Sequence, residues 1–387
     1  MPTLDTLAAF SFATAGEIRF GRGTAPAAVD AARAMGRRCF LVHGKNPDRA
    51  GWLLRALQDA GLTVTAFGCT QEPDLPLLDA ALASARASRP DLVVALGGGA
   101  AIDLAKAVAG LLPAFGPASD YLEVVGKGLP LPAAPLPMIA LPSTAGTGAE
   151  VTRNAVIGVP AHARKVSLRD RRLIPDLAIV DPALTDGCPR RVTLASGLDA
   201  LTQIVEPWIS ARANAMTDAL CIKAIPMALA ALPMLMQGED APARDAMAWV
   251  SLAGGLALAN AGLGVVHGLA GVIGGETGAP HGAICGALLP QGLAANRAAL
   301  DPGSRPARRI ARLNADLAEA LDAADDDGIA ALARWATAQG LPRLSAMGVR
   351  AVDHRRLAGA ARHASSMKAN PVDLPLAALT AMLAQAG

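Results

Sequence analysis

LVVALGGGAAIDLAK, residues 92–106, is the stretch of sequence that decides the fold. An apolar run that is typical of a buried strand enters three glycines and then an apolar-periodic helix pattern. Glycines at such a turn let the backbone approach a ligand, and the free N–H groups of the following helix attract an anion. Asp103 and Lys106 lie on the first turns of that helix. The usual GxGxxG fingerprint is absent here, and a tight turn without a ligand is the alternative interpretation.

The sequence on either side repeats the alternation of strand and helix. Apolar runs predict strands at residues 38–43, 62–67, 91–96 and 137–141, and helix patterns lie at 26–35, 47–60 and 75–88. This rhythm favours a mostly parallel sheet. A Pro/Gly-rich loop covers residues 113–137, and strand signals end at residues 179–182. We therefore predict an α/β domain at residues 1–185 and an all-helical domain at residues 186–387.

Length and composition exclude several classes of protein. The 387 residues are enough for two hydrophobic cores, and 35 Lys plus Arg against 33 Asp plus Glu leave a net charge of only +2. No overall field therefore attracts nucleic acid or an anionic membrane. The five cysteines are scattered without a CxxC pair, which indicates a reducing compartment. The first residues lack the features of a secretory signal, so we expect a cytoplasmic protein.

Residues 246–275 carry no charge and are long enough to cross a bilayer. The segment contains eight glycines, together with Ser251, Asn260 and His267, and it lacks basic anchors at its ends. We therefore expect a central helix of a soluble domain and no membrane partner.

A second turn of small residues, PSTAGTGAEVT at 142–152, follows the predicted strand at 137–141. Its hydroxyl groups and glycines supply hydrogen-bond donors and acceptors without bulk, which suits contacts to phosphate, ribose and an amide. An ordinary polar loop has the same composition.

Taken together, GGGAAIDLAK, PSTAGTGAEVT, LAIVDPAL, SGLDAL and HGLAGVIGGETGAPHG resemble the iron-containing (group III) alcohol dehydrogenase family in order and distance, over about residues 12–290. KANPVDLP in the helical tail fits as well. The resemblance implies a dehydroquinate synthase-like fold, with an N-terminal dinucleotide-binding α/β domain and a C-terminal helical domain. It also implies a metal in the cleft between the domains and a cytoplasmic homodimer or larger homo-oligomer.

The resemblance also implies which residues bind NAD or NADP. Residues 97–99 would cradle the pyrophosphate, while Asp103, Thr144, Thr147 and Lys165 would surround the nicotinamide half. The complete predicted set is Gly44, Gly97, Gly98, Gly99, Asp103, Ser143, Thr144, Thr147, Thr152 and Lys165. Lys165 belongs to a basic strip with His162 and Arg164, which is expected either to flank the cofactor entrance or to be a solvated face.

One departure from the family concerns the choice of cofactor. Members restricted to NAD tend to carry an Asp after the strand that here ends at His43, and this place is occupied by Gly44, followed by Lys45. Without the carboxylate nothing repels a 2′-phosphate, and Lys45 adds attraction. We therefore expect that NADP is accepted. The alternative is that Lys45 is an ordinary surface lysine.

The predicted metal ligands are Asp199, Gln203, His267 and His281. Asp199 and Gln203 share one helix face, and the glycine-rich span between the histidines lets the chain fold back. One carboxylate and two imidazoles suit Fe²⁺ or Zn²⁺. The family pattern is Asp, His, His, His, so the amide Gln203 is a weak substitute, although the glycerol dehydrogenase branch uses one Asp and two His. A further family histidine is replaced by Gly271.

These residues predict a metal-assisted NAD(P)-dependent oxidoreductase that moves hydride between nicotinamide and a small alcohol, aldehyde or ketone. A maleylacetate-reductase-like enzyme that acts on a dicarboxylate is the first alternative, and a dehydroquinate-synthase-like lyase is the second, although few lysines are available for a phosphate-bearing substrate. A nucleotide-binding protein without catalysis is the third. The sequence names no catalytic general base.

Overall fold

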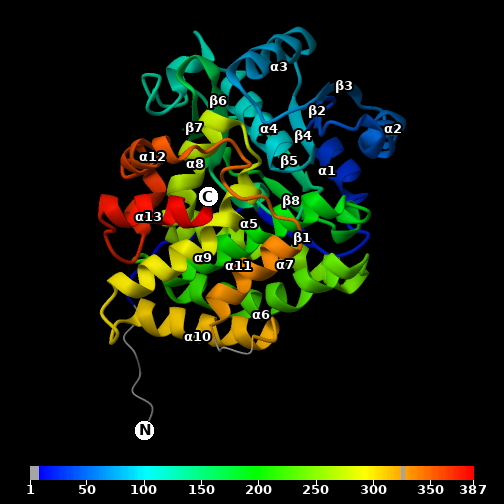
Figure 1. Cartoon of the computed structure of the whole chain (residues 1–387). Helices are drawn as coiled ribbons and strands as arrows, with labels where there is room; N and C mark the ends of the chain where they lie inside the picture. The colour runs from blue at the N-terminus through cyan, green and yellow to red at the C-terminus, as the bar shows by residue number, and fades with distance from the viewer. Residues whose placement is uncertain (1–7, 324–326) are drawn as a thin grey trace. The chain divides into compact units, whose positions relative to one another are not determined.

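The computed structural model describes residues 8–323 and 327–387, which form two compact units (Figure 1). One unit, called the α/β unit, comprises Thr14–Cys188 and Glu239–Ala248. The other, called the helical unit, comprises residues 8–13, Pro189–Gly238 and Trp249–Gly387.

The α/β unit contains a parallel sheet with the strand order β1-β8-β5-β4-β2-β3. Its strands are β1 (Glu17–Phe20), β2 (Arg38–His43), β3 (Thr63–Gly68), β4 (Leu92–Gly97), β5 (Met138–Pro142) and β8 (Leu177–Val180). Its helices are α1 (Ala27–Met35), α2 (Gly51–Asp59), α3 (Leu75–Ser88) and α4 (Gly99–Leu111). The chain leaves β2 toward β3 on one side and β4 toward β5 on the other. The adjacent β2 and β4 therefore form a topological switch point, where open α/β sheets bind ligands.

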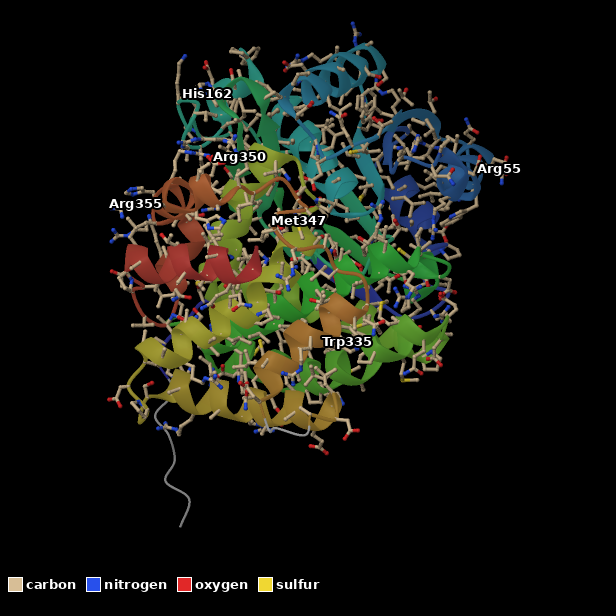
Figure 2. The ribbon with its side chains drawn as sticks, in the orientation of Figure 1. Arg55, His162, Trp335, Met347, Arg350 and Arg355 are labelled. Atoms are coloured by element: carbon tan, nitrogen blue, oxygen red, sulfur yellow. The ribbon has the colours of Figure 1, made fainter. Side chains whose placement is uncertain are left out.

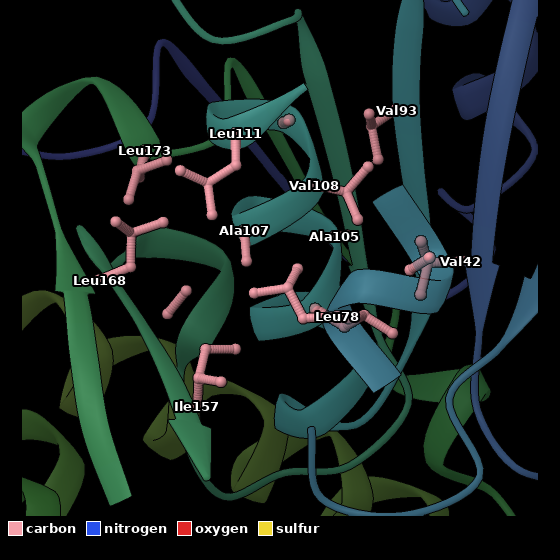
Figure 3. Packing of buried hydrophobic residues seen from close by; sticks show 14 of the residues in the cluster. Val42, Leu78, Val93, Ala105, Ala107, Val108, Leu111, Ile157, Leu168 and Leu173 are labelled. Carbon is pink, nitrogen blue, oxygen red and sulfur yellow. The ribbon is translucent and has the colours of Figure 1, made fainter. Parts of the chain in front are cut away.

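Alternate side chains of the central strands pack on opposite faces of the sheet. Val42 and Val93 pack with Leu78 of α3 and with the apolar face of α4 (Figure 3). Their neighbours Leu41 and Val94 belong instead to the cluster that holds α1 and α2. Both faces are thus covered, which is why the strands are apolar throughout and why only their ends remain for polar chemistry.

The predicted strands are confirmed as β2 to β5, each within one residue, and the predicted helices as α1, α2 and α3, with a 3₁₀ turn at Pro47–Ala50 before α2. Two features were not predicted. One is the short edge strand β1. The other is an antiparallel hairpin of β6 (Asn154–Val159) and β7 (Arg164–Arg169). Its buried residues alternate with exposed ones, but the Pro160–His162 turn lacks the usual Asn-Gly signal.

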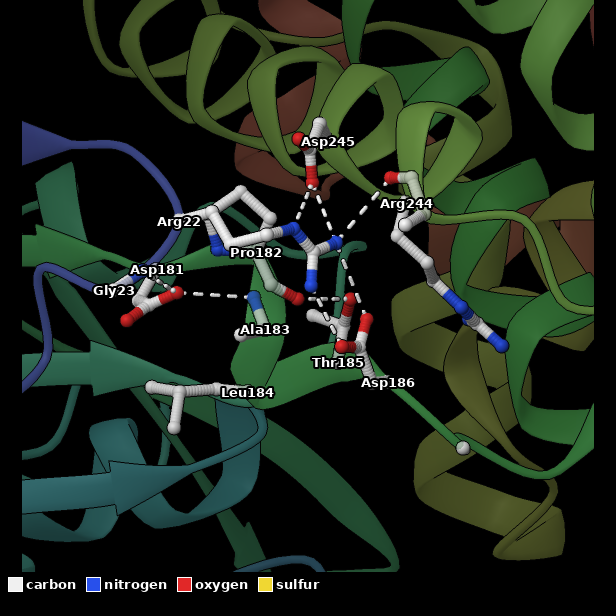
Figure 4. A network of polar contacts seen from close by, with 12 residues as sticks. Arg22, Gly23, Asp181, Pro182, Ala183, Leu184, Thr185, Asp186, Arg244 and Asp245 are labelled. Carbon is white, nitrogen blue, oxygen red and sulfur yellow. Dashed lines mark hydrogen bonds and ion pairs between the residues drawn. The ribbon is translucent and has the colours of Figure 1, made fainter.

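Arg22 explains why residues 239–248 belong to the α/β unit. Its guanidinium lies 2.6 Å from Asp186 and 2.6 Å from Asp245, and Figure 4 shows it between these two carboxylates. Asp181 accepts hydrogen bonds from the backbone N–H groups of Gly23 and Ala25 nearby. These contacts attach the segment after β1 to the end of β8 and to the start of helix α7.

The helical unit contains α5 (Arg190–Ile209), α6 (Ala215–Gln237), most of α7 (Ala241–Ala261), α8 (Val265–Thr277), α9 (His281–Ala299), α10 (Arg305–Ala320), α11 (Gly328–Ala338), α12 (His354–Ala361) and α13 (Leu376–Ala386). The prediction of one central helix over residues 246–275 is wrong. The segment breaks between α7 and α8 with a bend of 100°, where Gly262 adopts a positive φ of 73°. A left-handed glycine ends a helix in this way.

In the described part of the chain, α6 alone is long and apolar enough to cross a bilayer, and the bent α7–α8 pair would also qualify if it counted as one span. Half of the apolar window of α6 is buried against the protein itself, as in a core helix.

Helices α5 and α9 lie in direct contact because glycines remove the side chains between them. A Cβ atom at Gly282 of α9 would lie 2.3 Å from the carbonyl oxygen of Ala195 in α5, and one at Gly286 would lie 2.6 Å from a methyl group of Leu198. Side chains on the facing turns of α5 and α9 are therefore held unusually close together.

We predict that Gly282→Ala destabilises the helical unit by about 1–3 kcal/mol, because the added methyl group meets backbone atoms that cannot rotate away. Thermal unfolding of the protein without added metal, followed by far-UV circular dichroism, measures the change in Tm. The matched control is Gly359→Ala in α12, where a Cβ meets no described atom within 4 Å. This control is expected to keep or raise the Tm, because alanine favours helix over glycine. Equal Tm values for the two variants would contradict the close contact of α5 and α9.

Candidate cofactor and metal sites

The predicted cofactor residues of the α/β unit meet at its topological switch point. The N–H of Gly44, just after β2, donates to the carbonyl oxygen of Leu96 at 3.2 Å. The N–H of Ser143, just after β5, donates to the carbonyl oxygen of Gly97 at 2.8 Å. The ends of three neighbouring strands thus bring Gly44, Gly97 and Ser143 together.

The three glycines at the end of β4 and the start of α4 have little room for side chains. A Cβ at Gly97 would lie 3.1 Å from the Gly44 nitrogen, and one at Gly98 would lie 3.1 Å from Thr144 Oγ1. At Gly99 it would lie 2.7 Å from Thr147 Oγ1. The glycine turn and the 142–152 loop are therefore in contact, as the predicted cofactor site requires.

The beginning of α4 suits an anion. Gly98 is the N-cap residue, and within the described residues no side chain caps the helix. The first N–H groups of α4 and the positive end of its dipole thus lie at the glycine turn, where they favour a pyrophosphate.

Two other predicted cofactor residues, Asp103 and Thr152, form hydrogen bonds that hold the 142–152 loop and β6 against α4. Lys106 is fully buried, and its Nζ donates to Thr152 Oγ1 at 2.8 Å and to the carbonyl oxygen of Asn154 at 2.9 Å. Asp103 Oδ2 accepts from the N–H of Val156 at 3.1 Å. Thr152 and Asp103 thus connect α4 to the 142–152 loop and to β6. Their contacts to a cofactor stay a prediction.

A buried carboxyl group accompanies this lysine. Burial raises the pKa of Glu150 to about 7, with Lys106 opposing the shift, and burial lowers the pKa of Lys106 to about 8. Both carboxyl oxygens of Glu150 lack a hydrogen-bond partner among the described residues. The carboxyl group of Glu150 is therefore buried without a hydrogen-bond partner in the described part of the chain, within the loop that Lys106 holds.

The basic strip lies on the β6–β7 hairpin and its turn. His162 and Arg164 are exposed, and Figure 2 labels His162 on this hairpin turn. Lys165 is mostly buried and forms an ion pair with Glu72. The ammonium group that was predicted to contact the cofactor is therefore paired with a carboxylate in this structure. The place predicted for cofactor discrimination has an exposed Lys45 beside a half-buried Gly44. The roles of Lys165 and Lys45 stay predictions.

Three of the four predicted metal ligands meet in the helical unit. Asp199 of α5, His267 of α8 and His281 of α9 form a group with Cys285 of α9, and the ligand atoms lie within 4.8 Å of one another. Asp199 Oδ1 lies 3.4 Å from His267 Nε2 and 3.9 Å from His281 Nε2. Three helices thus direct a carboxylate and two imidazoles to one point.

Glu206 fixes the orientation of His267. Its Oε2 accepts a hydrogen bond from His267 Nδ1 at 2.7 Å, and its Oε1 accepts one from the N–H of Val266 at 2.7 Å. Because a carboxylate only accepts, Nδ1 donates its proton to Glu206, and Nε2 is the ring nitrogen that faces Asp199. The start of α8 and the imidazole are therefore held by one side chain.

The group fits a divalent cation. Asp199 is buried, and its Oδ1 has no hydrogen-bond partner among the described residues although two imidazoles face it. Burial disfavours both charged forms, but the acidic neighbours raise the pKa of His267 and the imidazoles lower the pKa of Asp199. A cation would displace the bound proton and satisfy the carboxylate. His281 is one-third exposed, which leaves one side of the group accessible to a substrate.

Gln203 is buried on α5 one turn after Asp199, and a Cβ at Gly254 of α7 would lie 3.1 Å from its Cβ. Its role as a ligand stays a prediction. One member of the group, Cys285, and the residue that orients His267, Glu206, were not predicted. Cys285 follows His281 by four residues and Glu206 follows Asp199 by seven, so helical spacing carried a signal for both.

Comparisons with known proteins agree with this geometry. The model of the family described as iron-containing alcohol dehydrogenase matches residues 15–182, and that of its C-terminal domain matches residues 193–387. The probable alcohol dehydrogenase EutG of Escherichia coli (strain K12) is 40% identical over 247 residues, which are 63% of this chain and 62% of EutG. This match thus spans less than two thirds of that relative's length.

Other relatives are similar over nearly the whole chain. Lactaldehyde reductase of Escherichia coli (strain K12) is 32% identical over 365 residues, 92% of this chain and 94% of the reductase. The crystal structure of a 1,3-propanediol oxidoreductase has a TM-score of 0.88 at 29% identity, and the alignment covers 98% of this chain and 100% of that one. The predicted dehydroquinate synthase-like fold is thereby confirmed. Because the two models together match most of its length, this chain belongs to the iron-containing alcohol dehydrogenase family.

Proposed function

We propose that this chain is a metal-assisted NAD(P)-dependent enzyme that interconverts a small alcohol with its aldehyde or ketone. The observation that carries the proposal is the meeting of Asp199, His267 and His281, with ligand atoms within 4.8 Å, in a family of alcohol dehydrogenases. The relatives compared above are named as alcohol dehydrogenases, a lactaldehyde reductase and a propanediol oxidoreductase. Their names favour this reaction over the maleylacetate-reductase-like and dehydroquinate-synthase-like alternatives.

The chain's own residues supply binding and orientation. In the helical unit, Asp199 would contribute a negative charge to the metal site. Glu206 binds His267 through Nδ1, so that Nε2 is the nitrogen that would bind the metal. When bound, Fe²⁺ or Zn²⁺ would polarise the substrate C–O bond and stabilise negative charge on its oxygen.

In the α/β unit, the glycine turn and the start of α4 would hold the cofactor's pyrophosphate. Hydride transfer then requires that the nicotinamide meets the substrate carbon. Because Gly271 stands where the family has a further histidine, we propose that the proton leaves through water rather than through that side chain.

We further propose a cytoplasmic homodimer or larger homo-oligomer that acts on small molecules. The five cysteines, all of them free thiols, support a reducing compartment.

Cofactor choice gives a direct test. We predict that kcat/KM for NADPH equals or exceeds that for NADH, because Gly44 carries no carboxylate to repel a 2′-phosphate. Gly44→Asp is expected to lower kcat/KM for NADPH by about tenfold or more, which corresponds to about 1.4 kcal/mol, and to spare NADH. Initial rates of NAD(P)H oxidation with short aldehydes measure both. A strong preference of the unmodified enzyme for NADH would refute the prediction.

Removal of a metal ligand gives a second test. We predict that Asp199→Ala and His267→Ala each abolish bound metal and turnover, because each removes a charge or lone pair that the cation needs. Metal analysis of the purified protein and an NAD(P)H assay on the same sample measure both losses.

The matched control is His354→Ala in α12, a histidine that is equally buried at 8% exposure and lies outside the metal-ligand group. This control is expected to retain both metal and activity. Full activity of the metal-stripped enzyme would contradict metal assistance, whereas full metal content in Asp199→Ala would contradict the assigned site.

A further inference from the structure

We propose that the thiolate of Cys285 is the fourth protein ligand of the metal, in place of the histidine that Gln203 replaces, and that it makes the site selective for Zn²⁺ or Co²⁺ over harder cations. The inference rests on the proposed metal site and adds a ligand to it. It is supported by the position of Cys285, by the distances in the group and by the charge of a thiolate.

The packing of α9 places Cys285 beside the other ligands. His281 and Cys285 lie one turn apart on the same helix face, and a glycine follows each of them. Gly282 and Gly286 are the two glycines that let α9 contact α5 directly. Because α5 carries Asp199, the contact that brings His281 to this carboxylate brings Cys285 as well.

The distances match those between ligands of one tetrahedral ion. Bonds of about 2.0–2.1 Å to nitrogen or oxygen and about 2.3 Å to sulfur place tetrahedral ligands about 3.3–3.6 Å apart. Cys285 Sγ lies 3.6 Å from His281 Nε2, and Asp199 Oδ1 lies 3.4 Å from His267 Nε2. The distance from Asp199 Oδ1 to His281 Nε2 is slightly longer, at 3.9 Å. All four ligand atoms lie within 4.8 Å of one another, so one common centre requires the wider pairs to close by up to about 1.2 Å.

The charges also favour the thiolate. The amide of Gln203 is neutral and a weak ligand, so Asp199 is the one anion among the predicted ligands, and Glu206 adds its negative charge only through His267. Ligation by Cys285 breaks its S–H bond, releases the proton to solvent and forms a sulfur–metal bond, so that two anionic ligands bind the dication directly. Sulfur together with imidazole selects zinc-like ions and disfavours Mg²⁺ and Mn²⁺, which prefer oxygen.

Other cysteines provide a contrast. Cys39, Cys69 and Cys221 are also buried, yet Cys285 is the one cysteine in the metal-ligand group found among the described residues. Cys221 of α6 is as fully buried as Cys285, at 0% exposure. It therefore serves as a matched control for the effects of losing a buried thiol.

The test uses the full chain, stripped with a chelator under reducing conditions and loaded with Co²⁺. We expect a thiolate-to-Co²⁺ charge-transfer band in the near ultraviolet together with visible ligand-field bands of tetrahedral intensity. Cys285→Ser should lose the charge-transfer band and keep visible bands, whereas Cys221→Ala should keep both. Far-UV circular dichroism of each apo variant verifies that it is folded.

Affinity gives a second measurement. In competition with a chromophoric zinc chelator, Cys285→Ser should weaken Zn²⁺ binding by at least about 100-fold, since even residues outside the ligand shell contribute 10–100-fold. Gln203→Ala should change Zn²⁺ affinity far less. An equal loss in both variants, or a greater loss in Gln203→Ala, would overturn the assignment of the fourth ligand.

The outcomes separate this inference from the proposed function. If the unmodified protein binds Co²⁺ with visible bands and no charge-transfer band, Cys285 is not a ligand, while the metal site of Asp199, His267 and His281 stands. If Asp199→Ala removes the visible bands, that site is verified independently of the cysteine. If the unmodified protein binds neither Co²⁺ nor Zn²⁺, the proposed metal-assisted function and the thiolate ligand both fall.

Discussion

The direct contact between α5 and α9 is the constraint on which the candidate metal site depends. Gly282 and Gly286 let α9 approach α5 closely, and Asp199 on α5 lies near His281 and Cys285 on α9. Burying a carboxylate is costly unless a cation or hydrogen bonds compensate for it, and Asp199 Oδ1 has no hydrogen bond within the described residues. The packing therefore buries a negative charge on Asp199, which the imidazoles compensate in part and a divalent ion would compensate further. Glu206 accepts a hydrogen bond from His267 Nδ1 and thereby fixes the orientation of this imidazole.

The α/β unit uses glycine for a different purpose. At Gly97, Gly98 and Gly99 the missing side chains let three chain segments meet where parallel strands end, and they leave the N-terminus of α4 uncovered by a capping side chain in the described structure. Behind this surface, Lys106 connects α4 to Thr152 and to β6. Burial disfavours the charged forms of both Lys106 and Glu150, and neither carboxyl oxygen of Glu150 has a hydrogen-bond partner within the described residues, so low exposure to water destabilises these charges.

Much of this could be predicted from local sequence patterns, because the central strands, α1 to α4 and the glycine turn follow from hydrophobic period and glycine placement. The β6–β7 hairpin was missed because Val156 and Gly158 interrupt the polar positions of β6 and because β7 is rich in charged residues. The break between α7 and α8 was missed because a continuous apolar segment conceals one left-handed glycine. Asp199, His267 and His281 were identified through family resemblance. Cys285 and Glu206 were not, since their roles depend on which helices pack together, and helix packing is not encoded in any single segment.

The proposed metal site requires that one carboxylate and two imidazoles in the helical unit bind a divalent cation. X-ray absorption spectroscopy at the edge of the metal found in the purified protein tests this most directly. We expect nitrogen and oxygen neighbours at about 2.0–2.1 Å with the outer-shell scattering of two imidazole rings, and one sulfur neighbour at about 2.3 Å from the Cys285 thiolate. A shell of oxygen atoms alone, as in a hydrated surface-bound ion, would contradict it.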